Sequence, residues 1–177
     1  SVSWAESWIK GKCLGEPFEA VLPTIGRHQG LNASAAVLAA RVAGVGVTQA
    51  SAALALAQLP PMRMESFSLN GARVLLDTYN ASPPAMVSAI ETFADLPCMG
   101  RRFAVLGEMK ELGSETIEAH RKIGRALIKA NLYKVLFYGA PMTFARQELI
   151  RAGAPSDRLP FATSLKDVRE FLEIELA

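Results

Sequence analysis

The pattern of apolar and polar residues differs between parts of the chain, and near residue 74 an apolar run ends abruptly in a polar segment. The apolar residues 74–76 end at Asp77, and a polar loop then leads to Ser82 and Pro83. Such an apolar run is typical of a buried strand, and a serine before a proline is typical of a helix N-terminus. We therefore expect Asp77 at the carboxyl end of a strand, where open α/β sheets bind ligands. A simple turn cap is the plainer interpretation of this aspartate.

The second half of the chain repeats this change from strand to helix. Asn70-Gly71, a favoured hairpin turn, separates two alternating segments, and further apolar runs each precede a helical pattern. The pattern predicts strands at 64–69, 72–77, 102–106 and 134–138, and helices at 83–96, 114–131, from after Gly139 to about 152, and 163–176. Ser114 is expected to cap the helix at 114–131. A capping signal with Asp167 close by is expected to open the last helix, at 163–176.

Strands that alternate with helices predict an α/β fold. We expect a Rossmann-like, mostly parallel sheet with flanking helices from about residue 72 onward. Right-handed crossovers bring the loops after parallel strands to one edge of such a sheet. Asp77, Asn80, Glu108 and Glu111 follow the predicted strands, so we expect them on one rim.

The first third of the chain has a different pattern. Residues 32–42 are almost all alanine, valine and leucine, which predicts a helix inside a protein, and a second helix is expected from Thr48 to Leu59. Trp4 and Trp8 have the spacing of one helical face. Residues 18–22 alternate weakly, like a strand whose neighbours are absent.

Composition narrows the possible functions. Of the 177 residues, 50% are hydrophobic, yet no apolar run approaches the roughly 18 residues of a membrane span, and no signal peptide is apparent. The formal charge of +2 comes from well-mixed signs, which gives no nucleic-acid footprint. Cys13 and Cys98 are isolated, as expected for free thiols in a reducing cytoplasm, and no metal-ligand spacing occurs.

Four segments resemble motifs of the Mur ligases. Residues 26–33 (GRHQGLNA) resemble G-R-H-N-x-x-N-A, and residues 61–65 (PMRME) resemble P-G-R-x-E. Residues 77–83 (DTYNASP) resemble D-S-Y-N-A-N-P, and residues 106–113 (LGEMKELG), followed by His120, resemble L-G-D-M-x-E-L-G…H. Their order and spacing are similar to those of the branch that adds D-alanyl-D-alanine to UDP-N-acetylmuramoyl-tripeptide in peptidoglycan synthesis. The resemblance covers about residues 22–140.

This resemblance implies a domain organisation. Members have a domain for the UDP-sugar, a central ATPase domain and a C-terminal Rossmann-like domain. Residues 1–65 would be the end of the ATPase domain, and residues 66–177 the C-terminal domain, truncated before the family's final K-G-S strand. The sequence contains no G-x-x-x-x-G-K-[ST] phosphate loop. We therefore expect the missing upstream domains to carry the phosphate loop and the Mg²⁺ ligands, and the isolated chain to be inactive.

The implied reaction is ATP-dependent amide formation in the cytoplasm. ATP converts the carboxylate of UDP-N-acetylmuramoyl-tripeptide into an acyl phosphate, which the amine of D-alanyl-D-alanine then attacks. Phosphorylation supplies a leaving group, and the protein mainly positions the reactants and stabilises charge. No residue of this chain is expected to act as a catalytic group or metal ligand.

Nucleotide contacts are implied for two groups of residues. The adenine would meet the amide and imidazole side chains of His28, Gln29 and Asn32. The Asp77 carboxylate would accept from the ribose hydroxyls, and the Arg63 guanidinium would reach the ribose or phosphates. Gln29 stands where the family has asparagine, and Met62 stands where it has glycine, so the backbone at Met62 takes a positive φ less freely. A helix cap for Asn32 and a surface position for Arg63 are the plainer interpretations.

Contacts to the amine substrate are implied for the loops further along the chain. Three residues would lie between the nucleotide and amine sites and three near the incoming dipeptide: Tyr79, Asn80 and Ser82, then Glu108, Glu111 and His120. Ser82 replaces a family asparagine and Glu108 a family aspartate. Solvated acids and a structural histidine are the plainer interpretations of the last three.

Two other functions fit parts of the pattern. The first is a sister ligase of the folylpolyglutamate or cyanophycin type. Tyr79 and Asn80 argue against it, since those branches differ in this loop. The second is a non-catalytic, Rossmann-like binding domain.

Overall fold

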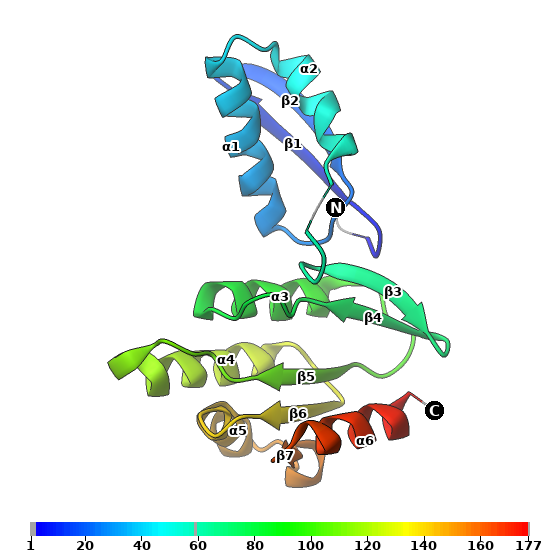
Figure 1. Cartoon of the computed structure of the whole chain (residues 1–177), viewed down its shortest axis with the longest axis vertical. Coiled ribbons are helices and arrows are strands. Elements are labelled where there is room, and N and C mark those ends of the chain that lie inside the picture. The colour runs from blue at the N-terminus through cyan, green and yellow to red at the C-terminus, as the bar shows by residue number, and fades with distance from the viewer. Residues whose placement is uncertain (1–2, 59, 177) are drawn as a thin grey trace. The chain divides into compact units, whose positions relative to one another are not determined.

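The computed structural model describes residues 3–58 and 60–176, and these residues form two compact units (Figure 1). The first unit contains the chain up to Phe67 together with Leu75–Tyr79 and Asp95–Pro97. The second contains Ser68–Val74, Asn80–Ala94 and the chain from Cys98 onward. The chain therefore returns to the first unit twice after leaving it at Phe67.

An antiparallel hairpin opens the first unit. Strand β1 (Ser7–Cys13) pairs with β2 (Glu16–Leu22) along its whole length. The helical interpretation of Trp4 and Trp8 is wrong, because Trp8 lies in β1. A spacing of four is also a multiple of two, so it fits one face of a strand as well as one face of a helix. The strand predicted at 18–22 is confirmed within β2, but it has a partner.

Two helices and a 3₁₀ turn follow the hairpin (Figure 1): α1 (His28–Val42), α2 (Val47–Ala53) and η1 (Leu54–Leu56). Helix α1 begins before Asn32, so this residue lies within the helix and does not cap it. Gly46, not Thr48, is the N-cap of α2. The predicted end of that helix at Leu59 lies outside the described residues.

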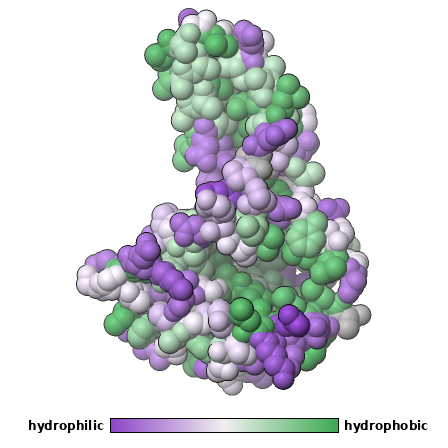
Figure 2. Space-filling model, in the orientation of Figure 1, coloured by the Kyte–Doolittle hydropathy of each residue, from purple (hydrophilic) through white to green (hydrophobic). Residues whose placement is uncertain are grey.

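The composition of α1 suggested a helix that is buried all round, but only part of its surface is buried. Its buried residues are Ala33 and Val37, whereas Leu31 and Val42 are 77% and 78% exposed. Figure 2 shows the apolar surface over the helices of this unit. Alanine-rich sequence is apolar without being bulky, so it does not by itself determine which face of a helix packs.

The predicted hairpin around Asn70-Gly71 is confirmed. Strands β3 (Glu65–Leu69) and β4 (Ala72–Leu76) pair with each other, and Asn70 and Gly71 have the positive φ values, 50° and 80°, that a tight hairpin turn requires. Asp77 follows β4 directly, as expected.

The second unit contains a parallel sheet of three strands in the order β5 (Phe103–Gly107), β6 (Lys134–Tyr138) and β7 (Phe161–Ala162). The Rossmann-like α/β class is therefore confirmed, but the parallel sheet begins at β5 instead of near residue 72, because β4 pairs with β3. Strand β7 was missed, since two residues are too few to show alternation.

Helices and 3₁₀ turns precede, connect and follow these strands: α3 (Pro83–Asp95) comes before β5, then η2 (Gly113–Glu115), α4 (Thr116–Lys129), α5 (Met142–Arg151) and η3 (Ser156–Arg158) lie between strands, and α6 (Leu165–Glu175) follows β7. The predicted cap of α6 is confirmed as a capping box between Ser164 and Asp167. Ser114 does not cap α4, because it lies in the preceding turn η2. Among the helices of the described residues, none combines the length and apolarity that crossing a bilayer requires.

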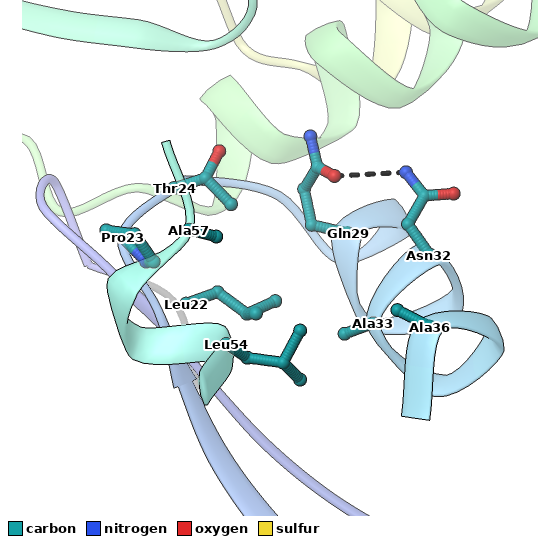
Figure 3. A pocket seen from close by; sticks show the side chains of 9 residues that line it. All are labelled: Leu22, Pro23, Thr24, Gln29, Asn32, Ala33, Ala36, Leu54 and Ala57. Atoms are coloured by element: carbon teal, nitrogen blue, oxygen red, sulfur yellow. Dashed lines mark hydrogen bonds between the residues drawn. The ribbon is translucent and has the colours of Figure 1, made fainter. Parts of the chain in front are cut away.

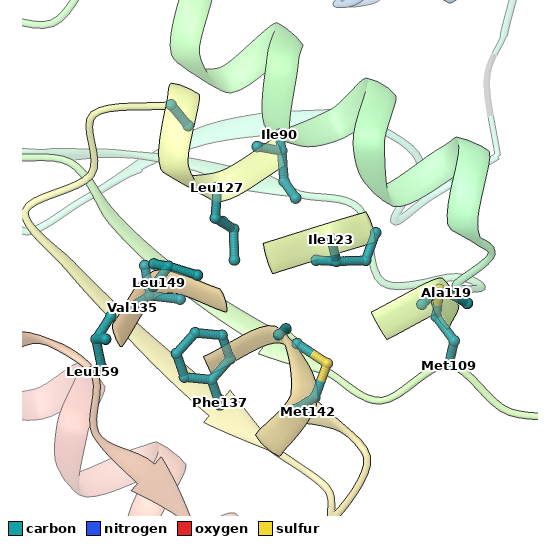
Figure 4. Close-up of a cluster of buried hydrophobic side chains, with 12 residues drawn as sticks. Ile90, Met109, Ala119, Ile123, Leu127, Val135, Phe137, Met142, Leu149 and Leu159 are labelled. Atoms are coloured by element: carbon teal, nitrogen blue, oxygen red, sulfur yellow. The ribbon is translucent and has the colours of Figure 1, made fainter. Parts of the chain in front are cut away.

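The core of the second unit lies where α4 and α5 pack on β6 (Figure 4). Phe137, Ile123 and Met142 are fully buried there. Helix α4 approaches α5 closely at Gly124, where a Cβ atom would lie 2.5 Å from the carbonyl oxygen of Ala145. This packed layer supports the loops at the carboxyl ends of β5 and β6.

Candidate functional site

In the first unit the 62–65 turn and the 77–79 loop are joined by hydrogen bonds. The carbonyl oxygen of Met62 accepts from the backbone N–H groups of Thr78 and Tyr79, at 3.0 and 3.2 Å. The Met64 N–H donates to Oδ1 of Asp77, at 3.2 Å. Asp77 therefore holds the turn with one carboxylate oxygen.

The 62–65 turn contains left-handed backbone. Met62 and Met64 have φ values of 59° and 54°, although neither is glycine. Met62 thus adopts the positive φ that was expected to be harder to reach without a glycine. The Met62 N–H donates to Oε2 of Glu65 at 3.0 Å, and the Met64 side chain is buried. Local hydrogen bonds and packing hold this conformation against its steric cost.

Arg63 and Tyr79 contact each other across these two segments. The guanidinium carbon of Arg63 lies 4.1 Å from the centre of the Tyr79 ring, and the ring is 58% exposed. A cation–π contact of this kind is worth about 0.5–1 kcal/mol at an exposed site. The two residues, expected to serve different substrates, form one surface.

The start of α1 presents two amide side chains beside a pocket of about 170 Å³ (Figure 3). Nδ2 of Asn32 donates to Oε1 of Gln29, at 3.0 Å. This bond leaves the Gln29 amide nitrogen as a donor and the Asn32 amide oxygen as an acceptor. Pro23, Thr24 and Leu54 also line the pocket. The pair offers the complementary groups that the amino and ring-nitrogen edge of adenine requires.

His28 precedes this pair and responds to Asp77. Partial burial lowers the pKa of His28 below 6.5, and the Asp77 carboxylate opposes this change by raising it. Asp77 therefore acts both on the 62–65 turn and on the first residue of α1. The first unit in this way connects the predicted nucleotide residues His28 and Asp77, which are distant in sequence.

In the second unit Asn80 and Ser82 lead into α3. Oδ1 of Asn80 accepts from the Ala81 N–H at 2.8 Å, and the Ser82 carbonyl oxygen accepts from the Met86 N–H at 2.9 Å. Both contacts are local, as expected for a loop that starts a helix.

Glu108 and Glu111 lie in the loop after β5. The Glu108 side chain lies against Gly139, where a Cβ atom would be only 2.8–2.9 Å from three of its carbon atoms. Gly139, at the end of β6, has a φ of 96°. Glu111 is exposed and has a φ of 62°. Sequence reasoning missed the part played by Gly139, which it treated only as the residue that ends a strand.

His120 is fully buried beneath this loop. Nε2 accepts from the Met109 N–H at 3.1 Å, so the ring proton is on Nδ1, which lies 2.7 Å from the carbonyl oxygen of Thr116. Both ring nitrogens are therefore occupied, and the side chain has no exposed surface. His120 could affect a substrate only through the loop that it holds, not by the direct contact that the resemblance implied.

The residues present fit part of a nucleotide. The Gln29–Asn32 pair offers groups for a base, and Asp77 retains a second carboxylate oxygen that could accept from ribose hydroxyls. The phosphates have no matching loop in the sequence. No cluster of three or more potential metal ligands occurs within residues 3–58 and 60–176.

Comparison with known proteins adds a family. Residues 62–177 match the family described as "Mur ligase, glutamate ligase domain". The chain is 30% identical, over 148 residues, to the UDP-N-acetylmuramoyl-tripeptide–D-alanyl-D-alanine ligase of Bacillus subtilis; the match covers 83% of the chain and 32% of that relative. The chain thus spans between about a quarter and a third of the length of the curated relatives that it matches.

Solved structures agree in fold. MurF from Acinetobacter baumannii superposes with a TM-score of 0.82 at 23% identity, over 99% of this chain and 38% of that one. A MurF ligase from Thermotoga maritima in complex with ADP gives a TM-score of 0.71 at 25% identity, over 97% of this chain and 44% of that one.

Proposed function

The chain belongs to the Mur ligase family through its glutamate ligase domain, and from this premise we propose that it is one part of an ATP-dependent amide ligase. Its relatives are named for joining D-alanyl-D-alanine to UDP-N-acetylmuramoyl-tripeptide, and we propose the same substrates here. Residues 1–65 would end the ATPase domain, and residues 66–177 would form the C-terminal domain. The free thiols Cys13 and Cys98 are consistent with the cytoplasm as the site of action.

The proposed reaction has two steps. A carboxylate oxygen of the tripeptide attacks the γ-phosphorus of ATP, which gives an acyl phosphate and ADP. The amine nitrogen of D-alanyl-D-alanine then attacks the acyl carbon, phosphate leaves, and the amine loses a proton as the amide forms. The phosphate loop and Mg²⁺ ligands would belong to the missing upstream domains.

The first unit would bind the base and ribose of ATP. Gln29 and Asn32 would pair with the adenine edge, and Asp77 would accept from the ribose hydroxyls. The observation that carries this proposal is the double role of Asp77, which binds the 62–65 turn and raises the pKa of His28. Arg63, stacked on Tyr79, would lie on the ribose or phosphate side.

The second unit would receive the amine. Asn80 and Ser82 would shape the loop before α3, and Glu108 and Glu111 would lie near the dipeptide. His120 would act by holding Met109, not by touching the substrate. Because a parallel sheet binds ligands beyond the carboxyl ends of its strands, the loop after β5 is a suitable place for the amine.

Phosphate release tests this proposal. A longer polypeptide that joins this chain to the missing domains should release phosphate only when ATP, UDP-N-acetylmuramoyl-tripeptide and D-alanyl-D-alanine are all present. The chain alone should show no turnover. Turnover by the chain alone would refute the assignment of the phosphate loop to another segment, and an inactive longer polypeptide would favour a non-catalytic binding domain.

Asp77→Asn tests the nucleotide contact. Hydrogen bonds to a charged group are worth about 1.5–3 kcal/mol, so the affinity of the longer polypeptide for ADP should fall roughly 10- to 100-fold. The matched control is Asp157→Asn, since Asp157 is an exposed aspartate of η3 in the second unit. Isothermal titration with ADP gives both values, and equal affinities in the two variants would remove Asp77 from the site.

A further inference from the structure

Glu108 occupies a position that only a glycine at 139 allows. A Cβ atom on residue 139 would lie 2.8 Å from the Cβ and Cγ atoms of Glu108 and 2.9 Å from its Cδ atom. Real Cβ atoms do not approach other carbon atoms so closely, so any side chain at 139 would move Glu108. The Glu108 side chain therefore lies over the backbone that joins β6 to α5.

The other side of Glu108 is also fixed. Its neighbour Met109 is buried, and the Met109 N–H donates to Nε2 of His120. Since His120 is itself fully buried in α4, the backbone next to Glu108 cannot shift without disturbing the core. The backbone next to Glu108 is thus fixed by the Met109–His120 hydrogen bond, and the Glu108 side chain fills the space that the absence of a Cβ at Gly139 leaves open.

The half-buried Glu108 side chain is fixed in position, but its carboxylate has no hydrogen-bond or ion-pair partner among residues 3–58 and 60–176. By contrast, Glu148 and Glu175, also in the second unit, are paired with Arg151 and Lys134. A partly buried carboxylate is costly to leave unpaired, so a fixed and unpaired one favours a cationic ligand.

We propose that Gly139 is a positioning residue, and that the space it leaves seats Glu108 so that the Glu108 carboxylate binds the ammonium group of the amine substrate. The inference rests on the proposed function for the identity of that amine. Glu108 lies beyond the carboxyl end of β5, beside the end of β6, which is where parallel sheets bind their ligands. Glu108 would hold the amine before it loses its proton and attacks.

A stability cycle on this chain tests the seating of Glu108 without any substrate. Gly139→Ala and the control Gly153→Ala impose similar backbone strain, because the two glycines have φ values of 96° and 90°, but a Cβ at Gly153 meets nothing within 4 Å. Gly139→Ala should therefore raise the unfolding equilibrium constant about tenfold more than Gly153→Ala does. In a Glu108→Gly background, which removes the Cβ, Cγ and Cδ atoms that a Cβ at 139 would meet, this excess should disappear.

The cycle has a clear contrary result. An excess that persists without the Glu108 side chain would show that Gly139 makes room for something else. If Gly139→Ala alone does not fold, the double variant decides: recovery of folding supports the proposal, and continued failure overturns it.

Binding to the longer polypeptide tests the ammonium contact. The probes are D-alanyl-D-alanine and its N-acetyl derivative, which lacks the ammonium group. Glu108→Gln and Gly139→Ala should each raise the KM for D-alanyl-D-alanine about tenfold or more and leave the KM for ATP unchanged. Neither should alter the inhibition constant of the N-acetyl dipeptide, and Gly153→Ala should alter none of these values.

The two tests separate the possible failures. Equal weakening of both dipeptides by Glu108→Gln would mean that Glu108 only shapes the site, which overturns the ammonium contact. If the longer polypeptide does not use D-alanyl-D-alanine at all, the proposed function fails. The stability cycle would still report whether Gly139 seats Glu108.

Discussion

The two units hold their candidate functional loops in different ways. In the first unit the 62–65 turn and the 77–79 loop are held together by main-chain hydrogen bonds and by the Asp77 carboxylate, at a turn in which Met62 and Met64 have positive φ. In the second the loop after β5 is anchored by buried Met109 and His120. The first arrangement is local and polar, so it would allow the loop to adjust to the proposed nucleotide. The second is tied to a packed core, so it presents a side chain at a fixed place.

The largest expected effect is a separation of the unfolding transitions of the two units after a core side chain is removed. Phe137→Ala deletes a fully buried ring from β6 and should destabilise the second unit by about 3–5 kcal/mol. Both tryptophans of the sequence, Trp4 and Trp8, belong to the first unit, so their fluorescence should change later in a urea titration than the far-ultraviolet circular dichroism.

The control for that experiment is Phe161→Ala in β7, whose ring is 38% exposed and should contribute much less. Coincident transitions in the Phe137 variant would mean that the two units unfold as one. The contrast between a local site and a core-anchored site would then lose its thermodynamic basis.

A smaller effect is expected at α6, which begins with a full capping box. Ser164→Ala removes the cap of α6 and should cost about 1 kcal/mol of unfolding free energy. The same substitution at Ser34 in α1 is the matched control, because its hydroxyl donates to the Gly30 carbonyl within the helix. Chemical denaturation of both variants measures the difference, and an equal loss would show that capping matters no more than any exposed serine.

The same capping box predicts a dependence on pH. The backbone N–H of Thr163, then its hydroxyl and the Ser164 groups, lower the pKa of Asp167 from 3.8 to about 2. A carboxyl whose pKa is lower in the folded state stabilises the fold above its unfolded pKa, and this contribution is lost as pH falls towards the folded pKa. Between about pH 4 and pH 2 the parent chain should therefore lose a contribution that Asp167→Asn never had. Parallel losses in urea titrations across that range would contradict the assignment.

Met62→Gly should act in the opposite direction, as a stabilising change in the first unit. A non-glycine residue at positive φ costs about 1–2 kcal/mol, and the greater freedom of glycine in the unfolded chain recovers part of this, so a gain of about 0.5–1 kcal/mol is expected. Met64→Gly is the control: it relieves similar strain but removes a buried side chain, and should destabilise. A loss of stability in both variants would show that the turn is not strained at Met62.

The smallest effect concerns the link between α1 and the 77–79 loop. His28 should titrate below 6.5 because burial disfavours its charged form, and Asp77→Asn should lower its pKa further by removing a favourable charge. Because the unfolded chain binds the proton more readily, stability should fall as pH drops below about 6.5. Proton NMR of the imidazole measures both pKa values, and no change in the variant would mean that Asp77 does not act on His28.

The sequence predicted most of the fold because its strands and turns are short and sharply bounded. Asp77 at the end of a strand, the Asn70-Gly71 turn and the capping signal with Asp167 all rest on local chemistry, and all three appear in the structure. Strand β1 and the two-residue β7 were missed, since pairing, not periodicity, defines them. Helix α1 was placed too late because Asn32 resembled a cap.

The candidate site was predictable where a motif carried it and not where packing did. The motifs pointed to His28 and Asp77, and the Asp77 carboxylate opposes the lowering of the His28 pKa by burial. The space over Gly139 has no signature in sequence, because a glycine after a strand reads as a simple break. His120 could not be assigned from its motif alone, since its role depends on which backbone groups its two nitrogens meet.

The first unit is discontinuous in sequence, and this affects how the protein is made. It is completed only by Leu75–Tyr79 and Asp95–Pro97, which follow a departure into the second unit. When the ribosome has synthesised the chain up to Phe67, the segment that carries Asp77 has therefore not yet been made. During synthesis the opening hairpin and its helices must wait for later residues before the turn at Met62 gains its partner, whereas β5, α4 and β6 can assemble in the order in which they emerge.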